Sequence, residues 1–97
     1  MLTCNWGWDE NVPKHGKVTS LSLRGCFLQT TVYGEQNKLL YLHLWAPMGE
    51  WLKLQGGVLY VMEGIGFGVG FRMPDDEEER RLNAVIDYFE RNPPVKR

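Results

Sequence analysis

Ser20, Ser22, Arg24 and Gly25 belong to the stretch SLSLRG, whose residue types and spacing could bind a ligand. The alternation of polar and apolar residues over 18–23 predicts an extended segment, in which both hydroxyls lie on one face. The glycine after Arg24 lets the backbone turn sharply or approach another group closely. We interpret the stretch as either a plain hairpin corner or the rim of a ligand site.

The segment GIGFGVGF over 64–71 is a second candidate, because glycine loops bind nucleotide phosphates in many enzymes. Its glycines recur at every second residue, whereas a dinucleotide loop has G-x-G-x-x-G before a helix and a phosphate loop ends in G-K-[ST]. A period of two predicts a strand with Phe67, Val69 and Phe71 on the core face. The opposite face then carries only glycine, so another element can pack closely there or the sheet can curl.

The histidines and cysteines form no catalytic or metal-binding pattern. His15 and His43 are far apart in the sequence, and Cys4 and Cys26 fit neither a CxxC pair nor a zinc spacing. We therefore expect no enzyme activity, no metal and no cofactor. Cys26 is predicted to be a small core residue, and unpaired cysteines favour a reducing, cytoplasmic location.

Length and charge argue against several classes of protein. The 97 residues are enough for one domain, spanning 1–97. With 11 basic and 12 acidic residues, the net charge of −1 gives no general attraction for nucleic acid or for an anionic membrane. The apolar span Leu39–Phe71 is broken by prolines, glycines and charges into pieces shorter than the ~20 residues that cross a bilayer. We expect no membrane insertion.

Trp6, Trp8, Trp45 and Trp51 are the remaining binding signal. Such rings could stack nucleic-acid bases on an open barrel face, but the sequence lacks the interleaved basic residues that this needs. Trp6 and Trp8 share one face of the N-terminal segment, where they serve as barrel lids, as core residues or as a contact surface for a partner.

Most of the chain before residue 73 predicts short strands with turns between them. The pattern is clearest in Leu39–Trp45, where leucine alternates with larger or polar residues. The glycine pair Gly56–Gly57 interrupts a strand-like run and predicts a bulge or bend. Closing so small a sheet into an antiparallel barrel, over residues 2–72, would remove its exposed edges. The predicted strands are 18–23, 26–32, 39–45, 51–54 continuing through 58–62, and 66–71.

The tail PDDEEERRLNAVIDYFERNPP predicts an amphipathic helix over about residues 75–91. Asp75 and Glu78 are spaced as a capping pair, and the acids around them suit the start of a helix. The apolar residues at helical spacing are Leu82, Val85, Ile86 and Phe89. We also expect ion pairs at Glu77–Arg81 and Asp87–Arg91, and a helix end at Pro93–Pro94.

The segments GKVTSLSLRGCFLQT, PMGEWLKLQGGV and GFGVGF, followed by this helix, resemble the PilZ domain family over about Gly16–Phe89. The resemblance implies a six-stranded antiparallel β-barrel with one C-terminal α-helix, and many members bind the bacterial messenger c-di-GMP. The family signature is an upstream RxxxR and a downstream [D/N]xSxxG on a strand and its turn. The downstream motif falls here on Ser20–Gly25, and the GxGxGVxF ending falls on Gly64–Phe71.

This chain departs from the family pattern at the residues that would hold the messenger. The resemblance implies that paired arginines bind phosphate and guanine as planar forks. No arginine precedes Arg24, and the basic residues of the N-terminal segment are Lys14 and Lys17. Ser20 stands where the motif has an acid or asparagine. Losing several charge-assisted hydrogen bonds, each worth ~1.5–3 kcal/mol, predicts much weaker binding of c-di-GMP.

The resemblance therefore implies a non-catalytic regulatory or adaptor module in c-di-GMP signalling, which contacts another bacterial protein of motility, pilus or signalling machinery. Trp6 and Trp8 are its predicted partner surface. One alternative is a c-di-GMP receptor in which other or upstream basic residues replace the arginine pair; another is a small-barrel binder of single-stranded nucleic acid. The ligand-binding residues of the receptor alternative are Ser20, Ser22, Arg24, Gly25, Lys14 and Lys17.

Overall fold

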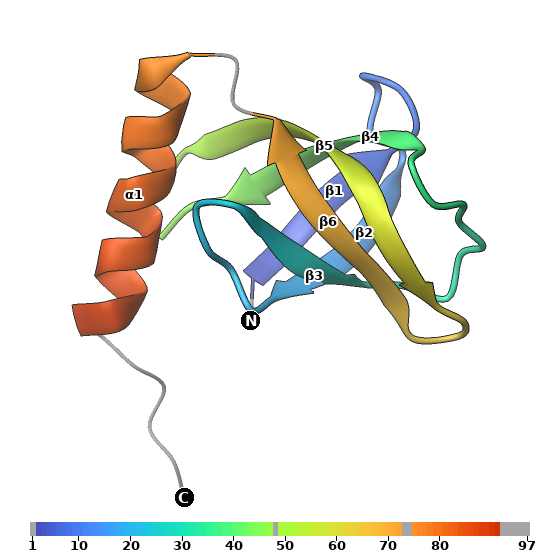
Figure 1. Ribbon diagram of the computed structural model, residues 1–97. Coiled ribbons are helices and arrows are strands. Elements are labelled where there is room, and N and C mark those ends of the chain that lie inside the picture. Colours follow the sequence, from blue (N-terminus) through green and yellow to red (C-terminus); the bar gives the residue numbers. More distant parts are fainter. Residues whose placement is uncertain (1, 48, 73–74, 92–97) are drawn as a thin grey trace, which may run out of the picture.

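The computed structural model describes residues 2–47, 49–72 and 75–91. It is a closed barrel of six antiparallel strands with one helix beside it, as the resemblance implies (Figure 1). The strands follow the order β1-β2-β3-β6-β5-β4, and pairing of β1 with β4 closes the barrel. The elements are β1 (Leu2–Gly7), β2 (Lys14–Thr19), β3 (Gly25–Gln29), β4 (Leu39–Trp45), β5 (Trp51–Met62), β6 (Gly66–Arg72) and α1 (Asp76–Arg91).

Alternate side chains of the strands fill the barrel. In β4, Leu40, Leu42 and Leu44 are buried, whereas the residues between them face outward. Trp6 of β1 and Phe67 of β6 meet edge to face in the core, with ring centroids 5.6 Å apart. The residues that alternate with this core form the outer surface of the barrel.

β5 is one continuous strand of 12 residues, which pairs first with β4 and then with β6. The bulge predicted at Gly56–Gly57 lies instead between Val58 and Tyr60, where the register with β6 shifts. Close packing explains Gly56, because a Cβ there would lie 2.6 Å from the carbonyl oxygen of Gly70, whereas the structure gives no such reason for Gly57. The bulge leaves two consecutive side chains, Leu59 and Tyr60, exposed on the outer surface.

β6 has the two faces that its period of two predicts. Phe67 and Val69 are buried, and Phe71 packs partly buried against the core. The outward positions from Gly66 to Gly70 carry only glycine, and a Cβ on Gly68 would overlap the ring of Tyr60. The bare glycine face thus lets a ring from β5 pack directly on the backbone of β6, which confirms the predicted close packing.

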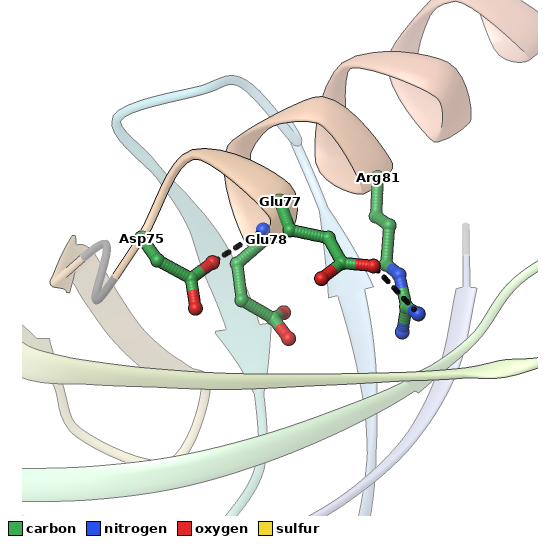
Figure 2. A network of polar contacts seen from close by, with 4 residues as sticks. All are labelled: Asp75, Glu77, Glu78 and Arg81. Carbon is green, nitrogen blue, oxygen red and sulfur yellow. Dashed lines mark hydrogen bonds and ion pairs between the residues drawn. The ribbon is translucent and has the colours of Figure 1, made fainter.

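Asp75 caps the start of α1, as predicted (Figure 2). The backbone N–H of Glu78 donates a hydrogen bond of 2.8 Å to Asp75 Oδ1, so an otherwise unpaired N–H of the first turn is satisfied. The two predicted ion pairs are also present, Glu77–Arg81 at 3.3 Å and Asp87–Arg91 at 3.1 Å. The predicted helix end at Pro93–Pro94 lies outside the described residues.

The apolar stripe of α1 packs on the barrel. Leu82 and Val85 are completely buried, and Ile86 and Phe89 are half-buried against the core. The helix contacts β5 and lies beside the end of the barrel where β4 ends and β5 begins (Figure 1). Each fully buried side chain of this kind contributes about 1.5–3 kcal/mol, so packing holds the helix to the barrel. No helix formed by the described residues is long and apolar enough to cross a membrane.

Candidate binding groove

The corner between β2 and β3 differs from the extended segment that the sequence predicts. β2 ends at Thr19, and residues 20–24 turn before β3 begins at Gly25. Ser20 has a φ of 52°, a left-handed conformation that breaks the alternation of the strand. The stretch is a hairpin corner, and the strand predicted over 18–23 is wrong beyond Thr19. Ser20 and Ser22 therefore do not share one face of a strand.

Ser22 holds this corner together. The backbone N–H groups of Arg24 and Gly25 donate to its Oγ over 3.2 and 3.3 Å, and its hydroxyl donates to the Gly25 carbonyl over 3.3 Å. The Ser22 N–H donates to the same carbonyl over 2.9 Å. The hydroxyl is therefore engaged inside the corner, as in other serine turns, and does not point free toward a ligand.

Gly25 is required by the sheet itself. It pairs with Gly70 across β3 and β6, and a Cβ at this position would overlap the carbonyl oxygen of Val69. The N–H of Phe71 donates to the carbonyl of Arg24 over 2.7 Å, which fastens the corner to β6. Only glycine fits this close approach. The serine and the glycine of the SxxG motif thus have structural roles.

A groove of about 550 Å³ lies beside this corner, over the outer face of β3, β6 and β5. Its polar wall is the corner, with Ser20, Ser22 and Arg24. A hollow of this size suits a small ligand or several side chains of a partner. The other wall and the floor include Phe27, Leu59, Tyr60, Met62, Ile65 and Gly68.

Large side chains of β3 and β5 pack around Gly68, which has no side chain of its own, and shape the floor of the groove. Phe27, Gly68 and Tyr60 are register partners across β3, β6 and β5. The Tyr60 ring lies over Gly68, and its centroid is 6.3 Å from that of Phe27, with the two rings tilted by 34°. Neither ring was predicted to belong to a binding site. Four consecutive apolar residues from Leu59 to Met62, where the alternation breaks, were the signal of a bulge that turns neighbours outward.

Arg24 is the one cation among the described residues that line the groove. Its guanidinium makes no hydrogen bond or ion pair with any other residue that the structure describes. Lys14 lies at the start of β2 with its Nζ 6.0 Å from the Trp6 ring centroid, and Lys17 pairs with Gln29 in mid-strand. The structure does not bring these two lysines, which were predicted to join the ligand site, to the groove.

Trp6 and Trp8 close one end of the barrel. Trp6 is completely buried, so its prediction as a partner surface is wrong, and its interpretation as a core residue is confirmed. The half-buried Trp8 packs edge to face on Trp6, with ring centroids 5.1 Å apart. Lys38 Nζ lies 4.5 Å from the Trp8 ring centroid, within reach of a cation–π interaction. Trp8 is therefore a lid whose outer part is accessible.

The exposed tryptophans lie on the outer face of β4 and β5. Trp45 and Trp51 are register partners, 46% and 43% exposed, and their ring centroids are 5.1 Å apart. The next outward pair along the same two strands is His43 and Lys53. Lys53 thus lies next to a pair of tryptophans across two strands, an arrangement that the linear sequence did not reveal.

A hollow of about 310 Å³ beside His43 and Lys53 is also lined by the carboxylates Glu10, Asp75 and Glu78. Burial, and secondarily Lys53, lowers the pKa of His43, so this imidazole is neutral near pH 7. Burial raises the pKa of Glu78, whose Oε2 has no hydrogen-bond partner among the described residues. The carboxylates of Glu10 and Asp75 offset the positive charge of Lys53 on this face.

Cys4 and Cys26 are buried free thiols, which confirms the core role predicted for Cys26. Burial raises the pKa of each to about 12. Both sulfurs are therefore protonated and poorly reactive in the folded chain. Within the described ranges, no three His, Cys, Asp or Glu side chains are grouped so that they could hold a metal ion.

Neither a scan against protein-family models nor a search of curated proteins gives a match for this chain. The case for a function therefore depends on the barrel, the Ser20–Gly25 corner and the groove beside it.

Proposed function

We propose that this chain is a non-catalytic regulatory module of the PilZ type, which acts in bacterial c-di-GMP signalling by contact with another protein. The closed six-stranded barrel with one C-terminal helix is the arrangement that the resemblance implies, and it supports the proposal. Because Ser22 and Gly25 have structural roles in the corner, the motif can persist in a chain that does not bind the messenger. The expected partner belongs to motility, pilus or signalling machinery.

The charge of the groove is the single observation that favours contact with a protein over binding of c-di-GMP. Arg24 is the one cation among the described residues lining it. A cyclic dinucleotide presents two phosphates and two guanines, and one guanidinium makes only one set of planar, paired contacts. The opposite wall is apolar and aromatic, which is the composition of the centre of protein interfaces.

Direct binding of c-di-GMP in the same groove is the second candidate. The exposed flat ring of Tyr60, with Phe27 beside it, favours this candidate, because a guanine could stack on such a ring. This candidate needs cations in addition to Arg24, and it needs the Ser22 hydroxyl to give up its bonds within the corner.

Binding of single-stranded nucleic acid has weaker support. Trp45 and Trp51 could stack bases, and Lys53 could contact a phosphate. The carboxylates of Glu10 and Asp75 line the hollow beside Lys53 and repel a phosphate backbone. This candidate predicts salt-sensitive retention on oligonucleotides, which Trp45→Ser would abolish.

Isothermal titration of c-di-GMP into the purified chain tests the preference between the first two candidates. We expect no saturable heat at micromolar concentrations, and Arg24→Ala and Lys17→Ala should behave like the unsubstituted chain. Saturable binding at micromolar or tighter affinity, lost in Arg24→Ala and retained in Lys17→Ala, would establish the receptor function instead.

A further inference from the structure

We propose that the groove binds a short segment of the partner protein that carries large apolar side chains and a carboxylate. The apolar side chains lie between Phe27 and the β5–β6 hairpin, and the carboxylate pairs with Arg24. This inference rests on the proposed function, because it names the chemistry of the partner at one site of contact.

The apolar wall is the first support. Leu59, Tyr60, Met62 and Ile65 are 55%, 50%, 45% and 54% exposed, although each is a large apolar or aromatic side chain. All four line the same groove. Single exposed apolar residues are common on protein surfaces, but several gathered around one concavity indicate a site of interaction. Burying them against apolar side chains of a partner would remove this surface from water.

The groove is preformed by the backbone. The bulge between Val58 and Tyr60 directs the side chains of Leu59 and Tyr60 outward, and the Tyr60 ring packs on Gly68. Ile65 is held in the hairpin turn, where its N–H donates to the carbonyl of Met62 over 2.9 Å. A partner segment therefore meets a surface that is already ordered, and binding loses little conformational entropy of this chain.

The charge of the polar wall decides which segment fits. Arg24 is the one cation of the described lining, and no carboxylate lines the groove among those residues. Its guanidinium fork and the hydroxyl of Ser20 have no hydrogen-bond partner among the described residues. A carboxylate matches the planar fork of an arginine and can accept from the nearby hydroxyl. A basic segment would be repelled by the same wall.

Selection from a random peptide library displayed on phage tests the proposal directly. The folded chain is the bait, and enriched peptides are synthesised and measured by fluorescence polarisation at low and high salt. We expect enriched peptides that combine large apolar residues with Asp or Glu, and binding that weakens as salt rises.

Two matched pairs of variants locate the binding site. Arg24→Glu should weaken the enriched peptides by about five- to tenfold, because a partly exposed ion pair of ~1 kcal/mol is replaced by repulsion. Lys17→Glu makes the same charge change outside the groove and should have no effect. Ile65→Ser should weaken binding, whereas Tyr33→Ser, at a side chain that is 71% exposed and does not line the groove, should not.

The outcomes separate this inference from the proposed function. A failure to enrich any peptide, enrichment of basic peptides, or affinities that Arg24→Glu and Ile65→Ser leave unchanged would each overturn the inference. Peptides whose binding is lost in Trp45→Ser but kept in Arg24→Glu would overturn it too, while leaving contact with a protein partner standing. Tight binding of c-di-GMP in the titration above contradicts the proposed function independently of the peptides.

Discussion

Replacing Ser22 with alanine tests whether the serine of the SxxG motif stabilises the fold without a ligand. The hydroxyl accepts hydrogen bonds from two backbone N–H groups and donates one to the carbonyl of Gly25, all within the corner. Ser22→Ala removes all three bonds. The corner forms the polar wall of the groove, so the same variant also tests whether these bonds hold that wall in place.

The magnitude follows from the geometry of these bonds. They are long, 3.2–3.3 Å, and exposed to water, which can replace them. Each typical bond contributes about 0.5–1.5 kcal/mol, and long, exposed bonds lie at the low end of that range, so we expect a loss of about 1–2 kcal/mol. For a domain of this size, 1 kcal/mol corresponds to a fall in Tm of about 4–8 °C.

Thermal unfolding of the purified chain without ligand, followed by circular dichroism, measures the effect. Ser20→Ala is the matched control, because the Ser20 hydroxyl makes no hydrogen bond within the described part of the chain and its loss should cost less than about 0.5 kcal/mol. Equal Tm values for the two variants would refute a structural role for Ser22. The serine would then have to be explained by a bound ligand.

Three further predictions concern the helix and the core. Asp75→Ala should lower the free energy of unfolding, measured by urea denaturation, by about 1 kcal/mol, because it removes the helix cap. Asp75→Asn keeps an acceptor and should cost less. Burial raises the folded-state pKa of Glu78, so the contribution of this group to stability falls as pH rises from about 4.5 through that raised pKa. Glu78→Gln should therefore raise the Tm at pH 7 but not at pH 4, and an equal gain at both pH values would contradict this titration of Glu78. Cys4 and Cys26, with pKa values of about 12, should resist iodoacetamide at pH 8 until the chain unfolds, which mass spectrometry detects.

Elements whose pattern is local were predicted well. The strand Leu39–Trp45 and the helix Asp76–Arg91 follow from periods of two and of 3.6, which depend only on neighbouring residues. The strand over 18–23 failed because Ser20 is left-handed, a conformation that lets β2 turn into β3. The bulge at Val58–Tyr60 was placed too early, because it arises from the register between β5 and β6.

Sequence reasoning predicted one wall of the candidate groove but not the other. Ser20, Ser22, Arg24 and Gly25 do lie together beside one groove, since they are adjacent in the chain. The opposite wall comes from β5, more than thirty residues away, and its position depends on pairing through β6. Lys14 and Lys17 do not line the groove, because they come before Thr19, the residue of β2 that reaches it. Trp6 failed as a surface because the inward face of β1 became the core.

The sequence by itself determined the alternation that builds the barrel, the capped amphipathic helix and the absence of an arginine before Arg24. Only the tertiary structure decided that the Tyr60 ring covers Gly68 beside Phe27, that the Ser22 hydroxyl bonds within the corner, and that Trp45, not Trp6, reaches the surface. The physical reason is that periodicity acts between neighbours along the chain. A groove, by contrast, depends on strand register, which brings together residues that no local pattern connects.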